Sequence, residues 1–577
     1  MRRLVPVALV MLVALSAAAL SNARPANKVH RSQSFVVLYK QGVSAAEARA
    51  AVRAAGGRVV RENRKVGVAT AHSSNPRFLT AASRSAAIEG VARDKRIGFV
   101  PRASRNGKGG AVDKFAFEKG DFNGEPAGSR VTPVAPPAAA DPLASLQWDM
   151  RMIRATPDGS HAVEPGDRGV RVGIIDTGID ASHPDLAANF DRRLSRNFTT
   201  DIPVDSLGNE IDGPCADDPD GSCSDPADVD EAGHGTHVAG TVAAAANGIG
   251  VTGVAPKVTL VNLRAGQDSG FFFLQPSVDA LTYAGDNGID VVNMSYFIDP
   301  WLFNCTNHPA DTPAEQLEQQ TIITATERAL AYAHRHGVTL IAAAGNEAVD
   351  YSKTVIDTTS PDFPLGTEKE REVPPSCSDL PSEGKNVIVT TALGPSERLS
   401  FYSSYGVGHA DVSAPGGDSL DTTTGLANPQ NRILSTYPAF VARTGDIELD
   451  EIPDVDPETG EPISNRLICE RMADGSCTYY AYLQGTSMAA PHTTGVAAII
   501  VSKFGKRDKR KGGLGLQPNT VERILTRTAR EHACPTPNPT EFDQLCEGGL
   551  RYNGFYGFGI VDALSAATAG RSGHNNQ

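Results

Sequence analysis

The sequence predicts an α/β protein in which a parallel sheet is covered by helices on both faces, with a smaller α/β domain in front of it. From residue 169 onward, short apolar runs typical of buried strands alternate with longer stretches typical of helices. The length of 577 residues exceeds one average domain, and one large domain plus a smaller one accounts for it.

The first 23 residues have the pattern of a secretory signal peptide. Arg2 and Arg3 precede an apolar run over residues 4–20, and Ser21-Asn-Ala23 is a small-x-small cleavage site. A membrane anchor is the alternative, but the run is short for a bilayer span and no later stretch of the sequence is long enough. We therefore expect a secreted, extracellular protein without a membrane anchor.

A small α/β domain is predicted within residues 24–103. Its strands are expected at 34–39, 58–60 and 66–70, its helix at 45–55, and a closing segment at 88–100. Residues 104–140 are rich in Gly, Pro and Ala, which predicts a linker that buries little and is open to cleavage.

The large domain is expected to span residues 141–577. Strands are predicted at 169–176, 258–263, 289–294 and 338–343, and helices at 236–246, 276–287 and 314–336. This alternation predicts parallel strands joined by helices. In such sheets, ligand chemistry belongs at the carboxyl ends of the strands.

Charge is distributed unevenly along the chain. The formal net charge is −13, but residues 24–110 carry 18 Lys and Arg against 4 Asp and Glu, and residues 111–577 carry −29. A basic domain can bind nucleic acid, yet attraction between two parts of one chain explains the same asymmetry. We expect docking within the chain and no nucleic-acid partner.

Eight cysteines in an exported protein predict four disulfides. Pairing of sequence neighbours is the simplest hypothesis. It joins Cys215 with Cys223, Cys305 with Cys377, Cys469 with Cys477, and Cys534 with Cys546. Metal ligation is the alternative, but the sequence has no Cys-x-x-Cys or Cys/His cluster with zinc spacing.

Four segments carry residues suited to acyl-transfer chemistry. Ser487, in Gly-Thr-Ser-Met-Ala-Ala-Pro-His, opens an apolar helix, where backbone N–H groups can hold a negative charge. Alone, such a serine is usually a helix cap. His234, in His-Gly-Thr-His, offers a base for it, and Asp176 ends a buried strand as a carboxylate that can orient the base. Asn346, in Ala-Ala-Gly-Asn-Glu, can donate to an oxyanion.

With these motifs in this order, the sequence resembles the subtilisin-like serine proteases, or subtilases. The resemblance implies that Asp176, His234 and Ser487 form the catalytic triad and that Asn346 is the oxyanion donor. It also implies a three-layer α/β fold behind a ferredoxin-like propeptide, which inhibits the protease and assists its folding before it is removed. His183, His237 and His492 fall in the family's motifs at non-catalytic places, so we expect structural roles for them.

The function expected from this resemblance is a secreted, self-processed serine endopeptidase acting on proteins or peptides, and a monomer. Two alternatives remain open. An exopeptidase with the same chemistry would need a blocked cleft and a carboxylate that recognises the substrate's amino terminus. A non-catalytic binding protein on this fold would have a damaged triad, and all four positions are intact.

Two further segments match the family's substrate-binding strands. Asp268, Ser269 and Gly270 match the segment that pairs with an extended substrate as an added strand. Ser295 and Tyr296 match the strand lining the pocket for the residue before the scissile bond. Many subtilases continue there with glycines, whereas Tyr296 and Phe297 follow Ser295 in this chain.

Structural calcium is the cofactor that the resemblance implies, with no organic cofactor. Asp185 and Asn247 would supply side-chain oxygens, and Asp141 would add another ligand. Carbonyl oxygens of Ala245, Ile249 and Val251 would complete the shell, while an exposed aspartate beside an ordinary turn is the alternative. Two acidic insertions, residues 201–230 and 446–461, lack EF-hand spacing and are expected to be solvated loops, with a weak calcium site or a rim favouring basic substrates as the alternative.

Overall fold

The computed structural model describes residues 32–94, 114, 118, 140–216, 218, 221–422, 428–444, 467–508 and 512–570. The expected signal peptide, most of the expected linker and the second acidic insertion at 446–461 lie outside the described residues. Within the described part of the chain, none of the helices combines the length and apolar character needed to cross a membrane.

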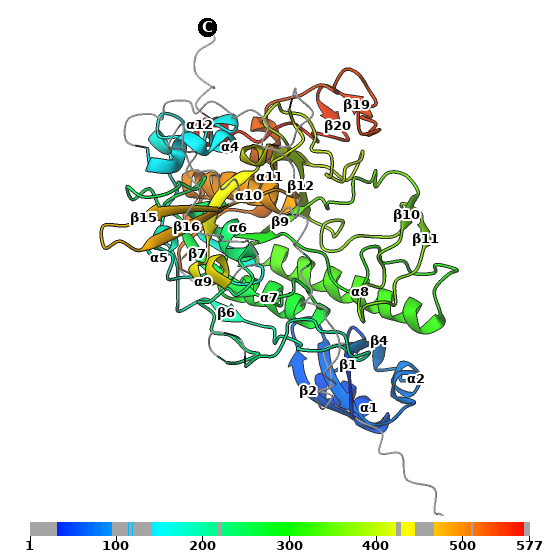
Figure 1. The fold of residues 1–577 in the computed structure, drawn as a ribbon. Helices are drawn as coiled ribbons and strands as arrows, with labels where there is room; N and C mark the ends of the chain where they lie inside the picture. Colours follow the sequence, from blue (N-terminus) through cyan, green and yellow to red (C-terminus); the bar gives the residue numbers. More distant parts are fainter. Residues whose placement is uncertain are drawn as a thin grey trace, which may run out of the picture.

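The centre of the large domain is a parallel sheet, as the sequence predicts (Figure 1). Its seven strands lie in the order β13-β12-β9-β8-β5-β7-β6, and every neighbouring pair is parallel. The bounds are β5 Arg171–Ile175, β6 Arg196–Asn197, β7 Thr259–Arg264, β8 Val291–Met294, β9 Thr339–Ala343, β12 Val387–Leu393 and β13 Val412–Pro415. Four of these strands were predicted within a few residues of their observed ends.

Helices cover both faces of this sheet, which confirms the predicted fold class. One face packs against α6 (His234–Ala243), α10 (Thr486–Phe504), α11 (Pro518–Thr528) and α12 (Ala563–Thr568). The other packs against α7 (Leu274–Asp286) and α8 (Pro313–Arg335). Successive side chains of a strand point to opposite faces of the sheet, so each face has its own hydrophobic core. Val291 belongs to the core under α6 and α10, and Val292 to the core under α7 and α8.

Residues 33–94 form a separate antiparallel sheet with the order β2-β3-β1-β4. The elements are β1 Gln33–Tyr39, α1 Ala45–Ala54, β2 Gly57–Asn63, β3 Val68–Ser73, α2 Phe78–Ser83 and β4 Ile88–Asp94. The helices cover one face of this sheet, where Val37, Val52 and Phe78 share a core. The βαββαβ order is that of a ferredoxin-like domain.

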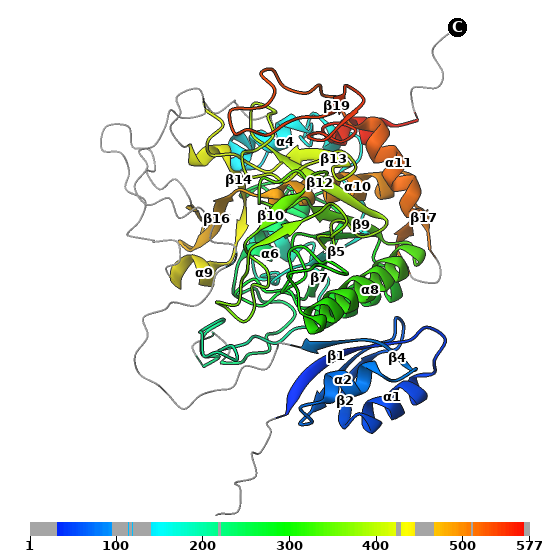
Figure 2. The ribbon, with the colours of Figure 1, turned by 90° about the vertical axis from the view of Figure 1, so that its right-hand side faces the viewer.

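The opposite face of the small sheet rests on α7 and α8 (Figures 1 and 2). Val36 and Leu38 of β1 share one apolar cluster with residues of both helices. Polar contacts flank it: the Asn63 amide donates to Asp279 at 2.8 Å and to Thr282 at 2.6 Å. Arg328 of α8 donates in turn to Glu89 at 2.6 Å. The basic small domain and the acidic body therefore meet through apolar packing and opposite charges.

Disulfides join the cysteine pairs that the nearest-neighbour hypothesis predicts. All eight cysteines lie in the large domain. The bridge between Cys469 and Cys477 links neighbouring strands of the small sheet β14-β16-β15, whose bounds are Ile433–Tyr437, Cys477–Leu483 and Leu467–Arg471 in that order. Short elements complete the chain: α4 Trp148–Met152, α5 Pro184–Ala187, α9 Ala439–Thr444, β10 Val355–Asp357, β11 Arg371–Val373, β17 Lys506–Arg507, β18 Leu514–Gly515, β19 Gly548–Gly549 and β20 Tyr552–Asn553.

Candidate active site

A carboxylate and an imidazole meet at the carboxyl end of β5. Asp176 directly follows this central strand, and His234 is the first residue of α6. The Nδ1 atom of His234 lies 2.7 Å from Oδ1 of Asp176, and both side chains are fully buried. The backbone N–H of Thr177 donates to the same Oδ1 at 2.8 Å, so the carboxylate is held from two sides.

Asp230 holds the loops that carry these two residues. Its Oδ2 accepts from the backbone N–H of Thr236 at 2.8 Å and from the Thr236 hydroxyl at 2.6 Å. Its Oδ1 accepts from the hydroxyl of Thr177 at 3.0 Å and from the N–H of Gly233 at 2.9 Å. Asp230 thus ties the segment after β5 to the start of α6. Sequence reasoning missed it because it lies among many aspartates of the first acidic insertion.

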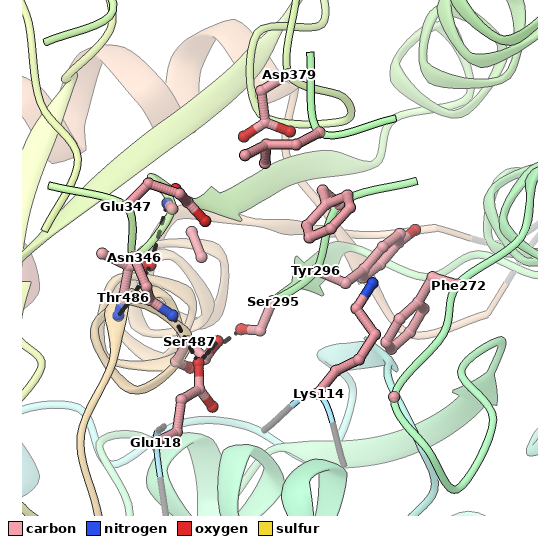
Figure 3. A pocket seen from close by; sticks show the side chains of 15 residues that line it. Lys114, Glu118, Phe272, Ser295, Tyr296, Asn346, Glu347, Asp379, Thr486 and Ser487 are labelled. Carbon is pink, nitrogen blue, oxygen red and sulfur yellow. Dashed lines mark hydrogen bonds between the residues drawn. The ribbon is translucent and has the colours of Figure 1, made fainter. Parts of the chain in front are cut away.

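The serine and the asparagine approach from α10 and from the end of β9, which is separated from β5 by β8. Ser487 lies in the first turn of α10, and Asn346 follows β9. The Oδ1 atom of Asn346 accepts from both the N–H and the hydroxyl of Thr486 at 2.9 Å. This pair of contacts turns the Nδ2 donor of Asn346 toward the open side of the site, where Ser487 also points (Figure 3).

Glu118 occupies the space between these groups. Its Oε1 accepts from the Ser487 hydroxyl at 2.6 Å and from Nδ2 of Asn346 at 2.9 Å (Figure 3). Its Oε2 lies 2.8 Å from Nε2 of His234. Oε1 therefore takes the place that a substrate carbonyl oxygen would take between a nucleophile and an oxyanion donor. The linker was predicted to bury little, yet Glu118 is only 3% exposed.

This carboxylate changes the protonation of the base. Burial disfavours the imidazolium, but the adjacent carboxylates of Asp176 and Glu118 outweigh it and raise the pKa of His234 to about 10. A histidine that already holds its proton at neutral pH cannot accept one from a serine. In this structure Asp176 and Glu118 therefore favour the protonated form of His234.

The sequence of this chain also matches a known protein family. Residues 167–559 match the sequence model of the Subtilase family. The chain belongs to the subtilase family. Membership places it among serine proteases, which are hydrolases. The "Thermophilic serine proteinase" of Bacillus sp. (strain AK1) is 28% identical over 342 residues, which cover 59% of this chain and 54% of that protein.

Two other known proteins are similar to a larger part of this subtilase. The "Extracellular protease" of Xanthomonas campestris pv. campestris is 29% identical over 420 residues, covering 70% of this chain and 52% of that protein. The chain thus spans about half the length of both curated relatives. The solved structure of the epidermin leader peptide processing serine protease from Staphylococcus aureus aligns with a TM-score of 0.58 at 20% identity, covering 95% of this chain and 99% of that one. At this identity the likeness concerns the fold.

One cavity of about 250 Å³ beside Ser487 is lined by three of the five predicted substrate-binding residues, Gly270, Ser295 and Tyr296, whereas Asp268 and Ser269 are not part of its lining. The hydroxyl of Ser295 donates to the backbone carbonyl of Ser487 at 3.0 Å, which joins the pocket wall to the nucleophile. Tyr296 stacks on Phe272 with ring centroids 4.1 Å apart, so the two rings form one apolar wall (Figure 3). Gly270 lines the same cavity, while Asp268 points back to pair with Arg264 at 3.0 Å.

The other motif histidines have structural contacts in this subtilase. Nε2 of His237 lies 3.0 Å from the carbonyls of Ile433 and Ala481, and burial lowers the pKa of His237 to about 3. Nε2 of His183 lies 3.0 Å from the carbonyl of Tyr479. Nε2 of His492 lies 3.0 Å from Asp149.

The predicted calcium ligands gather around the loop after α6. The amide of Asn247 lies 3.1 Å from Oδ1 of Asp185, and the N–H of Gly248 donates to Asp141 at 2.7 Å. Glu470, which the sequence did not single out, accepts from the N–H of Gly250 at 2.6 Å. Burial raises the pKa of Asp185 to about 7. The contacts described for Asp141 and Asp185 include no lysine or arginine.

The first acidic insertion differs from its expected solvated state. Asp201 and Asp225 are 5% and 4% exposed and pair with the fully buried guanidinium of Arg264 on β7. Asp201, Asp225 and Asp268 lie close enough together to hold a cation, as do Asp218, Glu231 and Asp268. In the first group, Arg264 already supplies the positive charge, so the acidic residues compensate a buried arginine.

Proposed function

We propose that this chain is a secreted serine endopeptidase that is made as an inactive precursor and processes itself. Ser487 attacks the peptide carbonyl, while His234 accepts its proton and later passes it to the leaving amine. Asp176 orients the imidazole and stabilises its cation. Asn346 and the backbone N–H of Ser487 bind the oxyanion. Protein or peptide substrates lie along Asp268, Ser269 and Gly270, with Ser295 and Tyr296 lining the pocket beside the nucleophile.

The observation that carries the proposal is the set of contacts made by Glu118. One carboxylate contacts Ser487, His234 and Asn346 together. These three side chains must lie this close to one another if they are to act on a single substrate carbonyl. Glu118 precedes the large domain in the chain, so the same contacts support an inhibitory propeptide ahead of residue 141. Docking of the small domain on α7 and α8 supports this reading as well.

The test is the intact mass of the exported product. We expect the wild type to lack its first hundred-odd residues and Ser487→Ala to keep them, apart from the signal peptide. Ser502→Ala is the matched control, because Ser502 lies on the same helix outside the site and donates to the carbonyl of Ala498. Equal trimming of wild type and Ser487→Ala would assign the cut to another protease and refute self-processing.

Calcium is proposed as a structural ion held by Asp185, Asn247, Asp141 and the carbonyls of Ala245, Ile249 and Val251. The donor set fits, because buried carboxylate, amide and carbonyl oxygens are the ligands that calcium prefers. Two buried carboxylates whose described contacts contain no basic side chain also favour a bound cation. When bound, the ion would tie residue 141, at the proposed start of the mature chain, to the loop after α6.

Export is proposed from the signal-peptide pattern of residues 1–23, and the name of the Xanthomonas relative supports it. Disulfides in the large domain agree with an oxidising compartment. We propose a monomer with its own small domain as its intramolecular inhibitor.

A further inference from the structure

A lysine side chain fills an acidic, aromatic-walled pocket at the edge of the substrate cavity. The ammonium of Lys114 pairs with Asp299 and lies 2.8 Å from Asp362. Its nitrogen also lies 4.5 Å from the ring centroid of Phe271 and 4.1 Å from that of Phe297. We call Asp299, Asp362, Phe271 and Phe297 the ammonium pocket.

The ammonium pocket has a fixed, buried carboxylate at its base and a partly exposed one beside it. The Asp299 side chain is fully buried and also accepts from the backbone N–H of Phe272, so it is fixed in place. The Asp362 side chain is 18% exposed. Two neighbouring carboxylates, one of them buried, repel each other and lose hydration, and a cation between them offsets both costs.

The position of Lys114 relates this pocket to substrate binding. Its backbone N–H donates to the carbonyl of Ser269 at 3.0 Å, on the segment proposed to pair with substrates. Four residues later, Glu118 lies between Ser487 and Asn346. Lys114 therefore lies beside Ser269 with its side chain in the ammonium pocket, and Glu118 lies at the nucleophile.

We propose that the ammonium pocket is a specificity subsite of the mature enzyme, which takes a lysine or arginine on the amino-terminal side of the scissile bond. This inference rests on the proposed function, because removal of the linker takes Lys114 out of the pocket. Asp299 and the partly exposed Asp362 then lose the one counter-charge described for them, until a basic substrate side chain replaces the lysine. The enzyme thus selects substrates by the same contacts that hold its own linker.

The walls of the pocket favour an organic cation over a metal ion. The faces of Phe271 and Phe297 flank the ammonium within the range of cation–π attraction. A calcium ion requires six to eight oxygen ligands, whereas the ammonium pocket offers two carboxylates and two apolar rings. A flexible basic side chain can pair with the two carboxylates and also pack against the two rings.

The test uses the processed wild-type enzyme and quenched fluorescent peptides of one sequence. Lysine is placed in turn at the second, third, fourth or fifth residue before the scissile bond and compared with uncharged norleucine. We expect lysine to raise kcat/KM at least tenfold over norleucine at one of these positions, with arginine acting similarly. Equal kcat/KM for lysine and norleucine at all four positions would overturn the inference.

The variant Asp362→Asn tests whether the preference for lysine over norleucine arises in the ammonium pocket. We expect the lysine-to-norleucine ratio of kcat/KM to fall toward one in this variant and to persist in Glu370→Gln, a control at an exposed glutamate of the same loop. A ratio that survives Asp362→Asn would place the preference elsewhere. If the processed wild type cleaves none of the peptides and no protein substrate, the proposed function fails; if it cleaves them without discrimination, only the subsite fails.

A second measurement does not depend on folding of a variant. A synthetic peptide with the sequence of residues 111–121 should inhibit the processed enzyme competitively. Replacement of the first of its two lysines, which corresponds to Lys114, by norleucine should raise the inhibition constant about tenfold, while the second lysine is kept. An unchanged inhibition constant would show that the pocket contributes nothing to binding, and would refute the proposal.

Discussion

The charge of Glu118 makes a direct prediction about His234. In the Glu118→Gln variant, the side chain keeps its shape but loses the negative charge that lies 2.8 Å from Nε2 of His234. At an effective dielectric of about 20, unit charges about 4 Å apart interact by about 4 kcal/mol. One pKa unit corresponds to about 1.4 kcal/mol, so the pKa of His234 should fall by up to about three. The pKa of His234 should therefore fall from about 10 to a value closer to neutral pH.

The assay is an NMR titration of the histidine side chains in full-length protein. The titration is done in the Ser487→Ala background, where the proposed precursor stays intact, and compares chains with and without the Glu118→Gln substitution. Glu89→Gln is the control, because it removes a contact between the small domain and Arg328 without touching His234. An unchanged pKa of His234 in Glu118→Gln would refute the reasoning. An equal fall in Glu89→Gln would assign the effect to loosened docking instead.

Three further predictions follow from the site. Asn346→Ala should lower kcat about 10²–10³-fold in peptide hydrolysis, because one oxyanion donor is lost, and a change in KM alone would contradict that role. Asp176 and the docked Glu118 together raise the pKa of His234 to about 10, so the stabilisation that Glu118 contributes is full near neutral pH and declines as pH rises from there toward 10. Inhibition by the linker peptide should therefore weaken across that range, and inhibition that strengthens with pH would contradict the assignment. Chelation of calcium should lower the melting temperature of the wild type and leave that of Asp185→Asn nearly unchanged, while equal losses in both would remove Asp185 as a ligand.

Much of this architecture could be predicted because the signals are local. The run before Asp176 is apolar and ends at a carboxylate, and its strand lies at the centre of the parallel sheet. Small apolar residues after Ser487 predicted α10 and its buried position. Pairing of sequence neighbours predicted the disulfides, and short separations of 8 to 12 residues favour closure of three of them, whereas Cys305 and Cys377 are 72 residues apart.

The missed features depend on contacts between distant parts of the chain. Glu118 stands in a Gly- and Pro-rich stretch, and its importance comes from residues more than a hundred positions away. Phe115 and Phe117 were the available signal, since two large apolar residues are unusual in a linker. Asp201 and Asp225 were predicted to be solvated because aspartates usually are. Their burial follows from Arg264, whose place inside the sheet only the fold reveals.

The small domain and the segment around Glu118 hold the body at two separate places, one on α7 and α8 and the other in the catalytic cleft. Such a bivalent ligand binds more tightly than either part, by about 10²–10⁴-fold, for as long as the chain between its parts is intact. One cut between residues 94 and 114 would end this avidity while leaving in place the contacts described for residues 32–94, Lys114 and Glu118. The two pieces would then leave at their own rates, so release of the cleft and departure of the small domain become separate events.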